Sequence, residues 1–204
     1  RVSRGLGDVY KRQVFEQEPI IEEPKNRSKR IAISVAIVLL VVVLAVASAL
    51  LVKFYVLESF IVDGISMYPT LDGGNGALID DDQNNGETLY LNKIAKIGRG
   101  DIVVFTPTKG DFAGKSLVKR VIAVGGDHVQ ITESAVFLNG EKLDEPYVNP
   151  AEIAIYSQPL DFYVQDGYVF CMGDNRNHST DCRVFGPVSV DTIVGKCFLI
   201  KGLD

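Results

Sequence analysis

Two side chains of the sequence, Ser66 and Lys119, could act together as a nucleophile and its base. A serine hydroxyl is a weak nucleophile and needs an adjacent base, and an uncharged lysine amine can be that base. Ser66 follows the strand-like run 60–62 and precedes Pro69, which interrupts regular strand pairing. Such a break can present a hydroxyl, although serine is also a common turn residue.

Lys119 lies in a run that alternates as a strand does. Alternation places Lys119 on the same face as Leu117, Val121 and Ala123, which are all apolar. Burial disfavours the ammonium form, and a neutral lysine at pH 7 requires its pKa to fall by about three units. The other interpretation is a lysine at a sheet edge whose stem covers apolar surface while its amine stays in water.

A third polar stretch, residues 173–186, follows the apolar run 168–172. Its acidic and basic residues offer two charge pairs that would stiffen a loop, either Asp181 with Arg183 or Asp174 with Arg176. Polar density alone indicates only a loop.

Residues 31–52 form an apolar segment of 22 residues without a charge, which as a helix would be roughly 33 Å long. Four basic residues precede it (Lys25, Arg27, Lys29 and Arg30), so the positive-inside rule puts residues 1–30 in the cytoplasm and residues 53–204 outside the cell membrane. Residues 1–13 differ in pattern from the rest, which indicates either a truncated start or a translated non-native lead-in, and they are left out of the expected fold. The alternative, a cleaved signal peptide, has small-x-small sites at 45–47 and 47–49, but the apolar run continues past them.

The remaining chain predicts a mainly β fold, an antiparallel coiled sheet behind one N-terminal transmembrane helix. Short runs rich in Val and Ile alternate with turn residues, and Asn139-Gly140 is a hairpin signal. The expected strands are 55–62, 77–79, 88–91, 101–106, 117–124, 128–132, 135–138, 167–172 and 193–200. Residues 144–166 are expected to form a small excursion from the main sheet.

Composition excludes some classes of function. The net charge is -5 and the globular part has no block of basic residues, so it lacks a surface for nucleic acid. Three cysteines, Cys171, Cys182 and Cys197, match no zinc or redox spacing. We expect no metal and no cofactor.

Four ordered stretches resemble the sequence motifs of bacterial type I signal peptidases, in particular the single-span members of Gram-positive type. They are Ser66-Met67-Tyr68-Pro69-Thr70-Leu71, Arg99-Gly100-Asp101, Lys119-Arg120-Val121, and Gly173-Asp174-Asn175-Arg176 with Ser179, Asp181 and Arg183. The resemblance spans residues 60–186 and includes the apolar segment upstream. It implies a membrane-bound serine endopeptidase with a Ser/Lys dyad.

The resemblance assigns roles residue by residue. Ser66 would attack the scissile carbonyl, and Lys119 would remove the Ser66 proton and later give a proton to the leaving amine. Ser179 would hydrogen-bond and orient the lysine amine. Asp181 and Arg183 would be a structural pair. The Ser66 N–H would stabilise the oxyanion. Some members carry a serine as second donor where this chain has Gly64, so that donor is left open.

The implied substrates are secretory preproteins, cut after a small-x-small motif while their apolar core stays in the membrane. Matching positions suggest that shallow apolar pockets are lined by Val62, Met67, Leu71 and Val118, although these four residues could equally be core. We expect contact with membrane lipid and no nucleic-acid partner. We also expect the protein to be a monomer.

Three alternatives remain. A sortase-like transpeptidase would use Cys182, Arg183 and either His128 or His178, but the Thr-Leu-x-Thr-Cys approach to its cysteine is absent. A self-cleaving Ser/Lys repressor would need a DNA-reading helix pair, which the sequence does not indicate. A catalytically inactive, membrane-anchored β module would bind peptides without cutting them.

Overall fold

The computed structural model describes residues 26–74, 86–108, 112–133, 135–149 and 159–202. The chain divides into two units, Arg1–Val46 and Ala47–Asp204. The expected strand 77–79 and the suspected lead-in 1–13 lie outside the described residues, as does most of the expected cytoplasmic tail 1–30.

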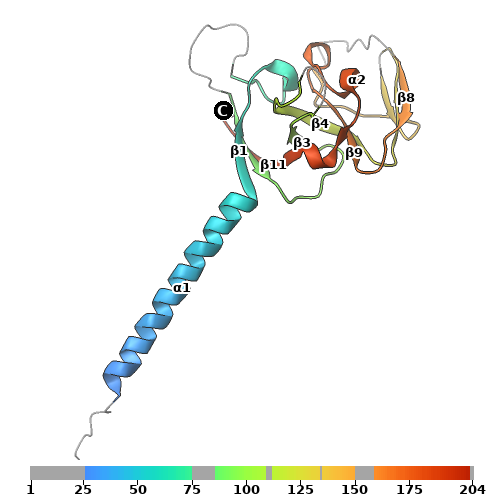
Figure 1. Ribbon diagram of the computed structural model, residues 1–204. Helices are drawn as coiled ribbons and strands as arrows, with labels where there is room; N and C mark the ends of the chain where they lie inside the picture. The colour runs from blue at the N-terminus through green and yellow to red at the C-terminus, as the bar shows by residue number, and fades with distance from the viewer. Residues whose placement is uncertain (1–25, 75–85, 109–111, 134, 150–158, 203–204) are drawn as a thin grey trace, which may run out of the picture. The chain divides into compact units, whose positions relative to one another are not determined.

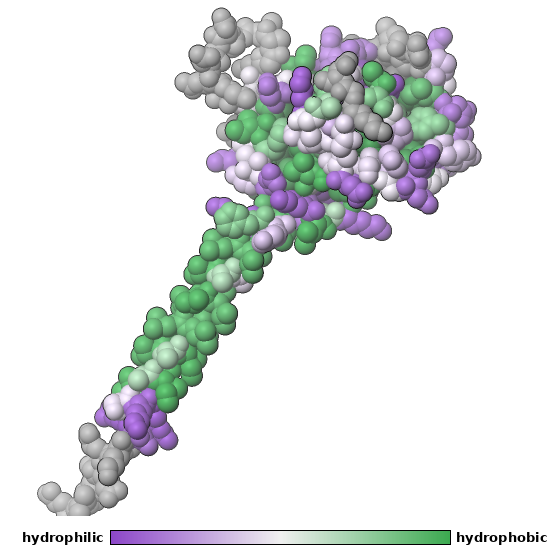
Figure 2. Space-filling view, in the orientation of Figure 1, coloured by the Kyte–Doolittle hydropathy of each residue, from purple (hydrophilic) through white to green (hydrophobic). Residues whose placement is uncertain are grey.

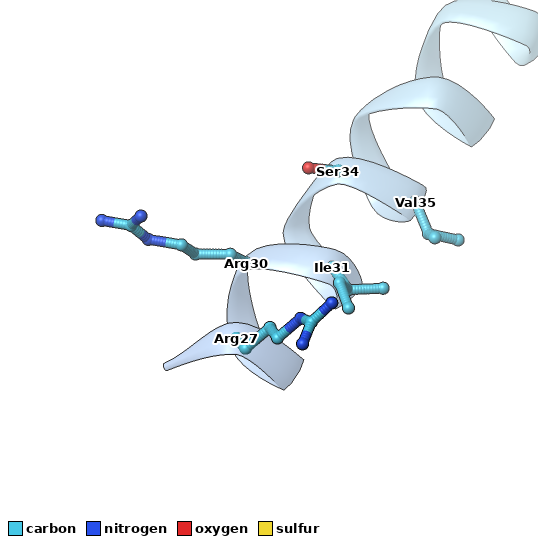
Figure 3. A pocket seen from close by; sticks show the side chains of 5 residues that line it. All are labelled: Arg27, Arg30, Ile31, Ser34 and Val35. Carbon is cyan, nitrogen blue, oxygen red and sulfur yellow. The ribbon is translucent and has the colours of Figure 1, made fainter. Parts of the chain in front are cut away.

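The apolar segment forms one helix, α1 (Arg27–Tyr55), four residues longer at its start and three longer at its end than the uncharged run. Within the described residues it is the one helix long and apolar enough to cross a membrane. Its surface is hydrophobic along almost its whole length in Figure 2. Arg27 and Arg30 extend from its first turn, beside Ile31, Ser34 and Val35 (Figure 3).

The larger sheet has seven strands in the order β1-β2-β11-β3-β4-β9-β10. Its strands are β1 (Leu57–Ile61), β2 (Thr88–Asn92), β3 (Ile102–Phe105), β4 (Leu117–Val124), β9 (Tyr168–Met172), β10 (Val188–Ser189) and β11 (Ile193–Lys201). Every pairing in it is antiparallel. Figure 1 shows β3, β4 and β9 adjacent in this sheet. The mainly β, antiparallel fold is therefore confirmed.

A second sheet has four strands in the order β7-β6-β5-β8. They are β5 (His128–Ile131), β6 (Val136–Leu138), β7 (Glu141–Lys142) and β8 (Leu160–Tyr163), and all pair antiparallel. Residues 150–158 of the excursion expected at 144–166 lie outside the described residues, and β8 near its end belongs to this second sheet. Because β8 pairs with β5, about 30 residues earlier in the chain, local pattern did not reveal it.

Short helices connect the strands: η1 (Ile65–Met67), η2 (Arg176–His178), α2 (Cys182–Phe185) and η3 (Val190–Thr192). Alternate side chains of the central strands β3 and β4 enter two core clusters, so both faces of these two strands are covered. Val103 and Phe105 of β3 belong to the larger cluster, with Val121 of β4, whereas Val104 and Val118 belong to the smaller one. The smaller cluster also holds Met67, the residue after Ser66, together with the nearby Val62 and Leu71.

Candidate active site

Ser66 lies in a tight turn that the end of β1 forces on the chain. The strand ends at Ile61, and the Val62 N–H still donates to the Glu87 carbonyl at 2.9 Å. Gly64 then adopts a φ of 92°, a region that residues with a side chain rarely occupy. The turn η1 follows at once and leaves Ser66 half-buried. Gly64 is therefore required by the backbone at this point.

Lys119 reaches Ser66 from β4, 53 residues later in the chain. Its Nζ lies 2.7 Å from the Ser66 Oγ and 2.9 Å from the Val118 carbonyl oxygen. The side chain is only 3 % exposed. Burial lowers the pKa of Lys119 to about 8 because a charged amine loses hydration there, and the nearby Asp181 carboxylate partly opposes that effect. The amine is thus poised to exchange a proton with Ser66 near neutral pH.

Asp181 holds the loop that follows β9. Its carboxylate, which is fully buried, accepts hydrogen bonds from the Gly173 N–H, the Ser179 hydroxyl and the Arg183 guanidinium. It also accepts from the Arg183 N–H and so caps α2. The Asp181–Arg183 ion pair measures 2.8 Å. One carboxylate therefore joins both ends of the loop.

Ser179 lies in the same loop, and its hydroxyl donates to Asp181 at 2.8 Å. The two hydrogen bonds described for the Lys119 amine go to Ser66 and to the Val118 carbonyl. That Ser179 orients the lysine stays a prediction. The contact seen places Ser179 beside Asp181, the residue whose charge acts on Lys119.

The second charge pair considered from sequence, Asp174 with Arg176, is wrong. Asp174 is fully buried and accepts two hydrogen bonds from Arg120, at 2.9 and 2.7 Å, and one from Thr70. Arg176 instead pairs with Glu145. Both partners are distant in sequence, which neighbouring motif residues could not indicate.

Arg120 lies in one of the sequence motifs, but the sequence analysis gave it no role. It follows Lys119 on β4 and bonds to Asp174 of the loop, and it lies 4.1 Å from the Tyr147 ring centroid. Through Asp174 it reaches Thr70, four residues after the nucleophile. The lysine strand, the serine turn and the loop are therefore tied together by one buried carboxylate.

The four apolar residues expected to line substrate pockets are core residues in this structure. Val62, Met67, Leu71 and Val118 all belong to the smaller core cluster and are between 0 % and 6 % exposed. They pack beneath Ser66 with Leu89, Leu91 and Val104. A role in substrate binding stays a prediction.

Two polar residues at the site were not singled out from sequence. Asn175 donates from its side chain to the Ile65 carbonyl at 3.0 Å and from its N–H to the Ser66 carbonyl at 3.1 Å. Glu87 is buried and accepts from the N–H groups of Asp72 and Gly73. Asn175 at least lies inside a recognised motif, whereas no local pattern marks Glu87.

The thiol expected in a sortase-like site is inaccessible. Cys182 is 1 % exposed at the start of α2, and its neighbour Cys171 is fully buried. Burial raises the pKa of the Cys171 thiol well above its usual range. His128 lies on the four-stranded sheet and pairs with Asp161. This arrangement gives the sortase-like alternative no support.

No described group of three or more His, Cys, Asp or Glu residues is arranged to hold a metal ion. The groups available for chemistry at the site are a hydroxyl, an amine with a lowered pKa, and backbone N–H groups. A hydroxyl in contact with a partly neutral amine is an arrangement suited to acyl transfer.

Comparison with known proteins identifies the family. Residues 34–201 match the model of the family described as signal peptidase, peptidase S26. Signal peptidase I T of Bacillus subtilis is 37 % identical over 166 residues, covering 76 % of this chain and 78 % of that protein. Signal peptidase I of Bacillus caldolyticus is 34 % identical over 167 residues, covering 74 % and 83 %.

A solved structure of a signal peptidase I from Enterococcus faecalis is 29 % identical, with a TM-score of 0.43, and the match covers 50 % of this chain and 97 % of that one. The family match itself rests on the sequence, from within α1 to the end of β11. The chain therefore belongs to the peptidase S26 family of signal peptidases.

Proposed function

We propose that this chain removes signal peptides from secreted preproteins with Ser66 as nucleophile and Lys119 as general base. The observation that carries the proposal is the 2.7 Å contact between the Lys119 Nζ and the Ser66 Oγ, made by an amine that burial keeps partly neutral. With a pKa of about 8, about a tenth of the lysines are uncharged at pH 7.

The first half of the reaction forms an acyl-enzyme. The Ser66 Oγ attacks the scissile carbonyl while its proton passes to the Lys119 Nζ, and the carbonyl oxygen becomes an oxyanion that the Ser66 N–H stabilises. The lysine then gives the proton to the departing amine as the C–N bond breaks. The mature protein leaves, and the signal peptide remains esterified to Ser66.

The second half restores the enzyme. A water molecule attacks the ester, Lys119 takes its proton, and the same proton returns to the Ser66 oxygen as the ester bond breaks. Ser179, Asp181 and Arg183 hold the loop beside the dyad through the hydrogen bonds described above. Cleavage follows a small-x-small motif, as in the resemblance noted from sequence.

The substrate meets this site at a membrane in the proposal. α1 anchors the protein, with the basic residues at its start in the cytoplasm and the β domain outside. Protease added to intact, right-side-out vesicles tests the orientation: it should digest the β domain and spare an N-terminal tag. Digestion of the tag alone would reverse the proposed topology.

The activity test uses the full chain in detergent with a purified preprotein bearing an Ala-x-Ala site. The wild-type protein should cut once after the second Ala, whereas Ser66→Ala and Lys119→Met should lose at least about 10³-fold in rate. A folded Cys182→Ala variant is the control and should retain activity. Equal cleavage by the Ser66 and Lys119 variants would contradict the dyad. An inert wild type would favour the peptide-binding module instead.

A further inference from the structure

Asn175 donates hydrogen bonds to two backbone carbonyl groups, that of Ile65, which precedes the Ser66 nitrogen, and that of Ser66 itself. Its side-chain amide donates to the Ile65 carbonyl at 3.0 Å, and its backbone N–H donates to the Ser66 carbonyl at 3.1 Å. Asn175 lies 110 positions after Ile65 in the sequence and is only 6 % exposed. The contact is thus a built feature between the loop after β9 and the serine turn.

The geometry of the peptide unit gives the side-chain bond its meaning. The Ile65 carbonyl and the Ser66 N–H belong to one planar, trans peptide unit, so they point in opposite directions. A donor that holds the carbonyl oxygen on one side therefore fixes the direction of the N–H on the other. The same hydrogen bond polarises the amide and makes its N–H a stronger donor.

Within the turn itself, the peptide unit between Ile65 and Ser66 is held by one other hydrogen bond. The Tyr68 N–H donates to the Ile65 carbonyl at 3.1 Å within η1. The Asn175 amide is the second donor to that oxygen and comes from outside the turn. It therefore couples the orientation of the peptide to the position of the loop.

The loop can approach so closely because residue 173 has no side chain. A Cβ at Gly173 would collide with the Ser66 carbonyl oxygen and with the Ser179 side chain. The adjacent Asp174 is tied to Arg120 and Thr70. Asn175 is thus presented to the serine turn from a segment that is anchored on both the lysine strand and the serine segment.

We infer that Asn175 is a positioning residue that aims the Ser66 N–H at the oxyanion through the Ile65 carbonyl. The inference rests on the proposed function, because it needs Ser66 to form a tetrahedral intermediate. The amide is required as a donor. An ionised aspartate of the same shape would place negative charge against the Ile65 oxygen and turn the peptide away.

The test compares Asn175→Ala with wild type in the full detergent-solubilised chain, on the preprotein with the Ala-x-Ala site. Deleting an oxyanion donor costs about 10²- to 10³-fold in kcat. A donor that remains but is less well aimed should cost less, so kcat should fall about 10- to 100-fold while KM changes by less than about twofold. Thr180→Ala, at an exposed position of the same loop, is the control and should match wild type.

A second variant, Asn175→Asp, supplies a readout that a purely structural role would not change. Its protonated carboxyl can donate to the Ile65 carbonyl and its ionised form cannot. The ratio of its kcat to that of wild type should therefore rise as the pH falls, whereas the same ratio for Asn175→Ala should stay flat. Because aspartate preserves the volume of asparagine, this variant carries the test if the alanine variant does not fold.

The outcomes separate this inference from the proposed function. If wild type cuts, Ser66→Ala is inactive and Asn175→Ala keeps a wild-type kcat, only the positioning role is wrong. A raised KM at unchanged kcat, or an Asn175→Asp ratio independent of pH, would also overturn it. If wild type is inert or Ser66→Ala cuts, the proposed function fails first.

Discussion

The charged side chains near Ser66, on β4 and in the loop after β9, are buried, whereas Asp161 of the four-stranded sheet lies largely in solvent. Asp174 and Asp181 are fully buried and Lys119 is 3 % exposed, but the side chain of Asp161, which pairs with His128, is 66 % exposed. A buried charge is costly unless it is paired, while a solvated pair contributes little. The region around Ser66 therefore accepts an energetic cost of burying charge that the four-stranded sheet avoids at Asp161, and this cost is concentrated where the chemistry is proposed.

The largest effect should come from exchanging one carboxylate for an amide in each region. Asp174→Asn should leave the mostly buried Arg120 without its counter-charge and destabilise the fold by about 3 to 5 kcal/mol. Urea unfolding of the solubilised protein measures this. The matched change Asp161→Asn should leave the unfolding midpoint unchanged within error. Equal shifts for both variants would remove the contrast between the two sheets.

The cost of burying Lys119 should appear as a pH dependence of stability. Below a pH of about 8 the amine is charged in both the folded and the unfolded state, and the fold bears the cost. Between about 8 and the usual pKa of 10.5 the unfolded state binds more protons, so stability rises with pH, by about 3 kcal/mol in total. The free energy of unfolding of wild type minus that of Lys119→Met, measured from pH 7 to 10.5, should show this rise. A difference that stays level would mean the amine is not desolvated.

Activity should follow the same group in the same direction. If the neutral Lys119 amine is the base, as proposed, kcat/KM should rise with pH and level off above a pKa of about 8. From pH 6 to pH 9 the increase should be about 100-fold, the ratio of the neutral fractions. Initial rates on the preprotein measure it, and His128→Ala in the other sheet should leave the profile unmoved. A profile flat across this range would exclude Lys119 as the base.

The smallest expected effects come from replacing one glycine in each region by alanine. Gly173→Ala should cost about 1 to 3 kcal/mol because its Cβ meets the Ser66 carbonyl and Ser179, and it should also lower activity. Gly140→Ala, at the turn between β6 and β7 with a φ of 85° and open space around it, should cost about 1 to 2 kcal/mol through backbone strain alone. Thermal melts and cleavage rates together test this. If Gly173→Ala and Gly140→Ala lost similar amounts of activity, the close approach of residue 173 to the serine turn would have no particular importance for cleavage.

Local pattern predicted much of the fold. The strand that carries Lys119 was predicted with its observed limits, Leu117–Val124, and seven other expected strands agree with observed ones to within two residues at each end. Alternation and turn residues act over a few positions, which is the range that a strand or hairpin needs. β8 and β10 were missed because they are short and pair with distant strands.

The sequence by itself determined the apolar helix from residue type, and it indicated Ser66 and Lys119 as the pair to examine through the resemblance of four ordered motifs to those of a known family. Only the tertiary structure decided what surrounds them. It brought the Lys119 amine to Ser66, gave Asp174 to Arg120 and Arg176 to Glu145, and set Asn175 against the Ile65 carbonyl. Partners separated by 31 to 110 positions meet only when the chain folds. Hydrogen bonds and ion pairs depend on distances in space and not along the chain.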